Sequence, residues 1–497
     1  MSKFNVSKDK SNLTENECGC VAYDMDDKLK LLTMTTTTFF AEGKFYGDTS
    51  EKIVALANKL IKKDKGQFVA NLAIYLRKEM HLRSMAQVLV VLLASNNEGK
   101  AFVRYACDGV IERADDITEI LACYISMNGK PIANALKKGL ASAMNKFDEY
   151  QFAKYNNRKK AVGFKDVLNL THAKAKDEAQ NAIFKAIMED SLKTPYTWET
   201  ELSARGNTKE VWEELISSNK LGYMALLRNL NNIIKAQPDN IDKALSDLVN
   251  GDNVRKSKVL PFRFYSAYKT LARNARFTSK VYDALETAIE ESVKNIEKLK
   301  GKTLIAIDVS GSMCNPLSSR SDMRYVDVAS VIGAMANKLC EESIVVTFDN
   351  RLEVVTFSNK NGIITNAKSI RATGGYTYCN LPIEYILDNK IFVDRVIMLS
   401  DDMCNFSYVE GCYTDYSPKR ELTPTKKVMD KYRKEVNANV FFHMIDLVGY
   451  GTSEVNYKEK LTSVVSGWDE NVLNYVSMYE NGFDEVVKMI DNYHLSK

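Results

Sequence analysis

The segment TLIAIDVSGSM, residues 303–313, places three hard oxygen donors directly after an apolar run. Asp308, Ser310 and Ser312 stand at alternate positions and supply one carboxylate and two hydroxyls. Residues 303–307 include Leu and Ile and carry no charge, which predicts a buried strand. Oxygen donors of this kind are the ligands that hard divalent cations prefer. The spacing therefore predicts a divalent-cation site at the end of a core strand.

Two later segments add oxygen donors of the same kind. Thr377 lies in ATGGYTYCNLP, and Asp401 and Asp402 lie in VIMLSDDM. Few carboxylates together with hydroxyls, and no His or Cys, favour Mg²⁺ over Zn²⁺, with Mn²⁺ and Ca²⁺ as alternatives. For an isolated D-x-S-x-S, the alternative is that Asp and Ser cap the following helix. The predicted ligands are Asp308, Ser310, Ser312, Thr377 and Asp401, with Asp402 as the alternative to Asp401.

After Lys302 the sequence alternates between strand patterns and amphipathic helix patterns. Strands are predicted over residues 303–310, 343–349, 352–358, 395–402, 439–448 and, as a short edge strand, 463–469. Helices are predicted over residues 325–340, 382–389, 428–436 and 483–494. This alternation is typical of an α/β fold, a doubly wound, mostly parallel sheet with helices on both faces. Ligands of such sheets bind at the carboxyl ends of strands, which is where Asp308 is placed.

The first part of the chain has a different pattern. From about Lys52 to Lys300 apolar residues recur at i, i+3 and i+4, as in KIVALANKLIKK and QFVANLAIYLRKEM, and separators such as NNEGK interrupt them. Successive short amphipathic helices predict an all-α helical-repeat array of HEAT-like type, and a compact helical bundle is the alternative. The predicted domains are a tail over residues 1–17, a helical domain over 18–300 and an α/β domain over 301–497.

The charge is distributed unevenly between these parts. The whole chain of 497 residues has a net charge of +4. Residues 1–300 carry 47 Lys and Arg against 38 Asp and Glu, whereas residues 301–497 carry 21 against 26. A basic half suggests a polyanion as partner, and an acidic half with clustered oxygens suggests a cation.

Several function classes are excluded by what the sequence lacks. No apolar stretch is long enough for a membrane helix, and the N-terminus has no signal-peptide core. Nine scattered cysteines without a sign of export predict reduced thiols and a cytoplasmic protein. The G-x-S-x-G, P-loop and H-E-x-x-H motifs of enzymes are missing. An aspartyl-phosphate nucleophile usually has a second Asp two positions on, where this chain has Ser310. We therefore expect a protein that is not an enzyme.

Basic residues gather in two clusters of the helical part, where cations beside aromatic residues can hold phosphates and bases. The first cluster, in YNNRKKAVGFK, has Arg158, Lys159 and Lys160; a solvated loop is its alternative. The second cluster, RKSKVLPFRFYSAYKTLARNARFTSK, contributes Arg255, Lys256, Lys258, Arg263, Arg273 and Arg276 as candidate RNA contacts. Its aromatic residues are predicted to lie in the core.

Two family resemblances follow from these segments. Asp308, Ser310, Ser312, Thr377 and Asp401 resemble the metal-ion-dependent adhesion site of the von Willebrand factor A domain, over about residues 301–497. LGYMALLRNLNNI, FKDVLNLTHAKAKDEAQ and KVLPFRFYSAYKTLARN resemble stretches of the TROVE module. In its order of a TROVE module followed by an A domain, the chain resembles a bacterial or phage member of the Ro ribonucleoprotein family.

The resemblance implies a fold and a function. In the Ro family, helical repeats close into a ring whose outer surface binds small structured noncoding Y RNAs. The ring hole accepts single-stranded 3′ ends of misfolded RNAs, in RNA quality control. His172 matches a histidine at the Y-RNA surface, with a structural role as the alternative. A monomer is expected, without membrane attachment, and an exoribonuclease is a further candidate partner. The alternative function is a metal-dependent protein-adhesion module whose A domain captures a partner's carboxylate.

Overall fold

The chain folds into two compact units, each assembled from two separate stretches of sequence. The structure, a computed structural model, describes residues 12–16, 18–37, 48–64, 66–156, 161–294, 296–317, 321–358, 360–405, 423–468, 471–482 and 486–493. One unit, here the sheet unit, comprises residues 1–41 and 223–486. The other, here the helical unit, comprises residues 42–222 and 487–497.

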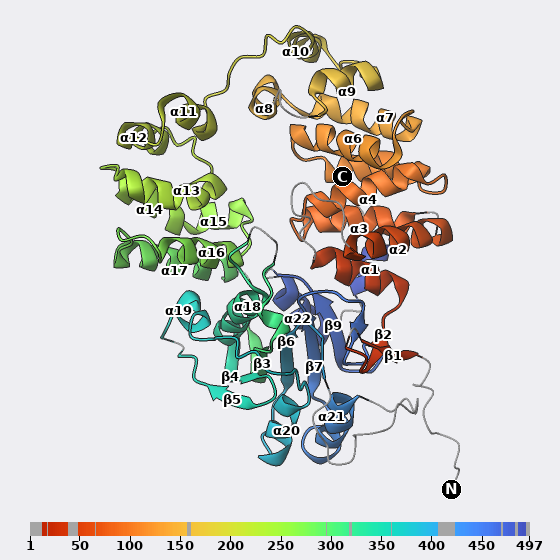
Figure 1. Cartoon of the computed structure of the whole chain (residues 1–497), viewed down its shortest axis with the longest axis vertical. Coiled ribbons are helices and arrows are strands. Elements are labelled where there is room, and N and C mark those ends of the chain that lie inside the picture. Colours follow the sequence, from red (N-terminus) through yellow and green to blue (C-terminus); the bar gives the residue numbers. More distant parts are fainter. Residues whose placement is uncertain are drawn as a thin grey trace. The chain divides into compact units, whose positions relative to one another are not determined.

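The helical unit confirms the helical spacing of the first part of the chain (Figure 1). Its largest fully buried side chains include Trp212, Phe68, Phe152 and Phe164, so apolar helix faces form its core. The helices of this part are α2 (Asp48–Asp64), α3 (Gln67–Lys78), α4 (Ser84–Ser95), η2 (Lys100–Phe102), α5 (Val103–Val110), α6 (Ala114–Asn128), α7 (Asn134–Ala143), η3 (Met144–Lys146), α8 (Glu149–Tyr155), α9 (Phe164–Thr171), α10 (Glu178–Met188), α11 (Trp198–Arg205) and α12 (Lys209–Ser217).

The end of the chain returns to this unit. The helix α23 (Val486–Asp491) lies within the helix predicted for residues 483–494. The side-chain amide of Asn71, on α3, donates to the backbone carbonyls of Ile490 and Asp491 at 3.0 and 3.1 Å. The hydroxyl of Tyr493 donates to Oε1 of Glu79 at 2.6 Å. These bonds hold the last described turn of the chain against α3.

The sheet unit contains the predicted α/β fold. Its main sheet has the order β5-β4-β3-β6-β7-β9, in which β5 pairs antiparallel to β4 and all other pairs are parallel. Strands β4 and β5 thus form a hairpin, and the predicted edge strand is confirmed. The strands are β3 (Leu299–Asp308), β4 (Cys340–Phe348), β5 (Leu352–Val355), β6 (Arg395–Ser400), β7 (Phe441–Asp446) and β9 (Thr462–Ser466).

Helices cover this sheet, and two of them have no counterpart in the sequence prediction. Helix α18 packs along β3, β4 and β6, and α22 packs against β7 and β9. The sequence pattern missed α19 and α22. The helices of this part are α18 (Tyr325–Leu339), α19 (Ile363–Ala367), α20 (Leu381–Asp388), α21 (Pro424–Glu435) and α22 (Asn471–Glu480), with η4 (Ser312–Cys314) at the end of β3.

The N-terminal residues belong to the sheet unit as well. The strands β1 (Leu13–Glu15) and β2 (Val21–Asp24), red in Figure 1, form a small antiparallel sheet with β8 (Thr452–Ser453). Helix α1 (Asp27–Thr36) follows and packs against β9. Part of the segment predicted as a tail is therefore a strand.

Five helices that precede the α/β fold in sequence pack with it. They are α13 (Tyr223–Ala236), α14 (Ile241–Val249), α15 (Gly251–Ser257), α16 (Phe262–Leu271) and α17 (Ser279–Val293). Helix α17 packs against α19, and α16 against α18. The carboxylate of Glu286, on α17, accepts the backbone N–H groups of Ile364 and Thr365 at 2.8 and 2.6 Å. It thereby supplies the acceptors that the first turn of α19 needs.

Candidate metal centre and candidate RNA contacts

The five predicted metal ligands come from three loops at one edge of the main sheet. Asp308 ends β3 and is completely buried, and its Oδ1 accepts the backbone N–H of Ser310 at 2.8 Å. The hydroxyls of Ser310 and Ser312 are 3.3 Å apart. The D-x-S-x-S spacing thus turns the chain sharply at the strand end, so that its three oxygen-bearing side chains gather at one place.

Asp401 reaches the same edge from the neighbouring strand. Strand β6 is parallel to β3, and Ile307 pairs with Leu399, so the two strands end side by side. The hydroxyl of Ser400 donates to Oδ2 of Asp308 at 2.6 Å. Asp401 is 1% exposed, and its Oδ1 accepts the backbone N–H of Met403 at 3.2 Å.

Thr377 lies on a loop that is held to the strand ends by hydrogen bonds. The backbone N–H of Gly311 donates to the carbonyl of Gly375 at 2.9 Å. Thr377 is 2% exposed; its N–H donates to Oδ1 of Asn405 at 3.1 Å, and its carbonyl accepts the N–H of Asn405 at 2.7 Å. The loops of Asp308, Thr377 and Asp401 are therefore bonded to one another.

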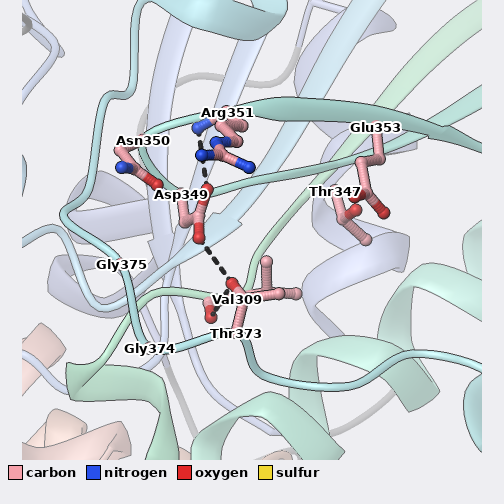
Figure 2. Close-up of a pocket in the computed structure, with 9 residues that line it drawn as sticks. All are labelled: Val309, Thr347, Asp349, Asn350, Arg351, Glu353, Thr373, Gly374 and Gly375. Atoms are coloured by element: carbon pink, nitrogen blue, oxygen red, sulfur yellow. Dashed lines mark hydrogen bonds between the residues drawn. The ribbon is translucent and has the colours of Figure 1, made fainter.

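Asp349, which follows β4, holds the other side of the threonine loop. Figure 2 shows its carboxylate between the hydroxyl of Thr373 and the backbone N–H of Arg351, at 2.6 and 2.7 Å. Its own backbone carbonyl accepts the N–H of Tyr378 at 3.0 Å. These groups border a cavity of about 360 Å³ that also reaches Val309, the residue between two predicted ligands.

The electrostatics of the strand ends favour a cation. Burial, and next the negative charge of Asp401, raise the pKa of Asp308 to about 7. Burial raises the pKa of Asp401 as well, against a hydrogen bond with Ser312 that lowers it. Two carboxylates taken out of water beside each other are unfavourable unless protons or a cation neutralise them.

Two further carboxylates lie buried at this edge, Asp402, the predicted alternative to Asp401, and Asp446, which the sequence reasoning missed at the end of β7. Among the described residues, each has an Oδ2 without a hydrogen-bond partner. Burial raises the pKa of Asp446 to about 7. Burial also raises the pKa of Asp402 well above its usual value, and the negative charge of Asp446 raises it further. A signal for Asp446 was present in the sequence, since the predicted strand NVFFHMIDLV carries Asp near its end, as does TLIAID.

The donor set fits a hard divalent cation. Two carboxylates and three hydroxyls are all oxygen donors, as Mg²⁺ requires. In the described part of the chain, no three His, Cys, Asp or Glu side chains are grouped so that they could hold a metal ion by themselves. If Mg²⁺ binds, Asp308, Ser310, Ser312, Thr377 and Asp401 are the residues that would hold it, and the ion would supply an electrophilic point for an oxygen ligand.

The cysteines differ from the expectation of reduced thiols. Cys379 and Cys404 form a disulfide, and their side chains are buried. The sequence pattern could not show this pair, because the pairing depends on how the loops after Thr377 and Asp401 meet in the fold.

The candidate RNA contacts of the second basic cluster lie on α15, α16 and the turns that follow them, and all are exposed. Arg255 pairs with Asp252, and Arg273 with Asp322 at 3.2 Å. The guanidinium of Arg263 lies 5.0 Å from the centre of the Phe262 ring. The candidates are Arg255, Lys256, Lys258, Arg263, Arg273 and Arg276.

The aromatic residues of the second basic cluster are in the core, as the sequence predicts. Phe262, Phe264 and Tyr265 are buried, as predicted for core aromatics. Arg276 donates to the backbone carbonyl of Lys235. Arg158, Lys159 and Lys160 of the first cluster lie outside the described residues.

His172 is exposed at the end of α9, in a left-handed conformation with φ of 53°. The loop after it is fixed by Asn145, whose side chain donates to the carbonyl of Lys174 at 3.0 Å and accepts the N–H of Lys176 at 2.9 Å. The structure thus presents His172, Lys174 and Lys176 on one ordered turn between α9 and α10.

Comparisons with known proteins match each of the two parts of the chain to a known domain. The TROVE domain model matches residues 9–194 and 186–277, and the Ro60 vWA domain model matches residues 302–479. A crystal structure of the Deinococcus radiodurans RO (RSR) protein superposes with a TM-score of 0.62 at 17% identity, over 92% of this chain and 100% of that one. This likeness supports the fold, a helix-rich part joined to a mostly parallel sheet.

Curated relatives cover parts of the chain. Telomerase protein component 1 of Rattus norvegicus is 24% identical, over 47% of this chain and 12% of the relative. The RNA-binding protein RO60 of Caenorhabditis elegans is 26% identical, over 47% of this chain and 38% of the relative. The chain therefore spans well under half the length of each of these two relatives.

Among the described residues, no helix has the length and apolar character to cross a bilayer.

Proposed function

Because a TROVE domain is followed by a Ro60 vWA domain, the chain belongs to the Ro ribonucleoprotein family, and from this we propose that it is an RNA-binding protein of Ro type. It binds small structured noncoding RNA of the Y type on basic surface residues. It also binds single-stranded 3′ ends of misfolded RNA in the ring hole that the family resemblance implies. Its place is RNA quality control in the cytoplasm.

The observation that carries this proposal is the combination of the TROVE match with positive charge. The match covers residues 9–277, and residues 1–300 hold the basic excess of 47 Lys and Arg against 38 Asp and Glu. Neutralisation of phosphates by Lys and Arg supplies most of the sequence-independent affinity for nucleic acid. One relative is itself named an RNA-binding protein.

The turn after α9 supports one contact for structured RNA. His172, Lys174 and Lys176 are exposed there, and the Nζ of Lys176 donates to the carbonyl of Asn145 at 3.0 Å. Since Asn145 already fixes the turn, little conformational entropy is lost when it binds a ligand. An imidazole can hydrogen-bond or stack on RNA while the neighbouring ammonium groups contact phosphates.

The end of α15 supports a second contact. Lys256 and Lys258 are exposed, and Lys258 has a left-handed conformation with φ of 52° directly after the helix. By contrast, Arg255 and Arg273 are held in ion pairs with Asp252 and Asp322. We expect the two lysines to contribute more to phosphate binding than the two paired arginines.

The A domain contributes a divalent cation in this proposal. Asp308, Ser310, Ser312, Thr377 and Asp401 hold Mg²⁺, and water or the oxygen of a partner completes its coordination. The support is the buried, mutually repelling pair Asp308 and Asp401 within an all-oxygen donor set. The cation is not a source of catalysis in this proposal.

The test is direct binding of RNA to the full chain. RNA that copurifies with the protein is sequenced, and a structured RNA and a short single strand are then titrated over about 50 to 200 mM salt, with and without Mg²⁺. Salt-sensitive binding of structured RNA without Mg²⁺ is expected. Mg²⁺-dependent capture of a protein, with no RNA retained, would instead support the adhesion function.

A further inference from the structure

The disulfide Cys379–Cys404 joins two of the three loops that carry the predicted metal ligands. Cys379 lies two residues after Thr377, and Cys404 lies three residues after Asp401. The Cα atoms of the two cysteines are 5.8 Å apart, a usual separation for a disulfide. The covalent path from one ligand loop to the other is therefore very short, although the cysteines are 25 positions apart in sequence.

Hydrogen bonds beside the disulfide also join the two loops. Thr377 and Asn405 exchange two hydrogen bonds, at 2.7 and 3.1 Å. The side-chain amide of Asn16, which precedes β2, donates to the carbonyl of Cys404 at 2.8 Å. Cys379, Cys404 and Asn16 are all buried, so these bonds form in surroundings largely shielded from water.

The three ligand loops differ in how they are supported. Asp308 belongs to β3, which is paired on both sides by parallel strands. Residues 370–378, which include Thr377, have no helix or strand assignment. The position of Thr377 relative to Asp401 thus depends on the disulfide, on Asn405 and on hydrogen bonds to the strand ends, because the segment of Thr377 is not itself paired in the sheet.

We propose that the Cys379–Cys404 disulfide positions Thr377 against Asp401, so that the cation affinity of the A domain depends on the oxidation state of this pair. The proposal rests on the cation site given under Proposed function. Reduction of the disulfide makes the loop of Thr377 more mobile. Thr377 and Asp401 are then less often close enough to bind the same ion. Preorganised ligands bind more tightly because less entropy is lost on binding.

The redox step is balanced by an external thiol couple. Two thiols of the chain and one low-molecular-weight disulfide give the Cys379–Cys404 bond and two small thiols, so two electrons and two protons move to the small molecule. In the reverse direction a water-soluble phosphine supplies two electrons, takes up the oxygen of water, and leaves two thiols on the protein. A phosphine is preferable to a dithiol reagent, because dithiols bind metal ions themselves.

The experiment measures Mn²⁺ affinity of the full chain by calorimetry before and after phosphine treatment. We expect about tenfold weaker binding in the reduced protein, the scale of effect seen when groups that orient metal ligands are removed. Cys379→Ser and Cys404→Ser should bind as weakly as the reduced protein and should not respond to phosphine. Cys340→Ser is the matched control, because Cys340 is a free cysteine at the first residue of β4.

Two further measurements make the result decisive. Mass spectrometry after alkylation under denaturing conditions counts the free thiols; alkylation of all nine cysteines in unreduced protein would overturn the proposal. Hydrogen exchange in metal-free protein follows the amides of Thr377 and Asn405, which should exchange faster after reduction. This readout does not need a cation, so it separates the two hypotheses.

The outcomes are distinct. Equal Mn²⁺ affinity and equal amide exchange in verified oxidised and reduced protein would refute the positioning role of the disulfide. Faster exchange after reduction in a protein that binds no Mn²⁺ would keep the positioning role and refute the cation site. Near-ultraviolet circular dichroism of the two serine variants establishes that they are folded before either result is interpreted.

Discussion

The hydroxyl of Ser400 donates a 2.6 Å hydrogen bond to Oδ2 of Asp308, across two neighbouring parallel strands. Asp308 Oδ1 is meanwhile bound to the backbone N–H of Ser310. Both oxygens of this buried carboxylate therefore have a fixed direction before any ligand arrives. Preorganisation of this kind is what a metal site needs from the residues behind its ligands.

Replacement of Asp308 tests the cation site directly. Asp308→Ala removes one of the two carboxylates of the predicted donor set, so we expect Mn²⁺ or Mg²⁺ binding to be abolished or weakened by more than about tenfold. RNA binding should be largely retained, because the candidate RNA contacts lie elsewhere in the chain. Calorimetric titration measures the first quantity, and a gel-shift assay measures the second.

A matched control for this variant is Asp388→Ala, which removes an exposed carboxylate at the end of α20. It should bind the cation as the wild type does. If Asp308→Ala and Asp388→Ala titrate alike, the assignment of Asp308 is wrong.

The stability of the sheet unit should depend on Glu286 far more than on Glu290, although both lie on α17. Glu286 accepts two backbone N–H groups of α19 and the hydroxyl of Thr365. Glu290 makes an ion pair with Lys338 at 3.0 Å that is partly exposed. Glu286→Ala should lower the free energy of unfolding by about 1–3 kcal/mol, since it leaves partly buried donors unpaired. Glu290→Ala should lower it by less than about 1 kcal/mol.

Chemical denaturation followed by circular dichroism measures both values. Equal destabilisation by the two glutamate substitutions would contradict the capping role of Glu286.

A fragment that ends near Lys300 should stay helical but become less compact in solution scattering, because α16 and α17 would no longer have the surfaces of α18 and α19 against which they pack.

The pH dependence of stability should contain a contribution from His443. The ring is completely buried between Ser463, at 2.8 Å, and Glu480, at 3.0 Å. Burial lowers the pKa of His443 in the folded protein, against the hydrogen bond to Glu480 that raises it. In the unfolded chain the pKa of histidine is about 6.5, so below that pH the unfolded state binds the extra proton.

The folded protein therefore loses stability as the pH falls below about 6.5, with a slope of up to about 1.4 kcal/mol per pH unit from this residue. His443→Gln should be less stable at pH 7.5 but should show a flatter pH dependence between about pH 7 and about pH 5.5. Urea unfolding at several pH values measures the slope. Parallel profiles for the variant and the wild type would show that His443 does not titrate as predicted.

The strands of the main sheet were predictable from sequence, because parallel strands buried on both faces appear as uninterrupted apolar runs. Residues 304–307 and 396–399 are such runs, and both lie within strands in the structure. The small sheet was not predictable. Its strands are short and partly polar, and Tyr23 of β2 pairs with Ser453, far away in the sequence. Local periodicity carries no information on such a partner.

The candidate site shows the same division. Residue type and spacing predicted that Asp308, Ser310 and Ser312 lie together at a strand end, because oxygen donors at such a position are a local signal, and the structure places them there. Ser400 and the Cys379–Cys404 bond could not be identified, since their role depends on the register between strands and on where two distant loops meet.

The first basic cluster should contribute to the salt dependence of RNA binding. Replacement of Arg158, Lys159 and Lys160 together by Ala removes three candidate phosphate-binding side chains. Binding of a structured RNA should weaken, and the slope of log affinity against log salt should become shallower by up to about 0.7–0.9 for each phosphate that is no longer neutralised. His172→Ala should weaken binding with little change in the slope, because a neutral imidazole releases no counterion.

Arg205→Ala provides the matched control for a removed positive charge. The guanidinium of Arg205 is exposed but pairs with Glu201 at 3.4 Å and with Glu214, where Nη2 and Oε1 are 2.8 Å apart. Its charge is already balanced within the protein, so its removal should leave the salt slope unchanged. A short single strand should be affected less than structured RNA by the triple change. An unchanged slope and affinity in the triple variant would assign that cluster to a solvated loop and direct attention to Lys256 and Lys258.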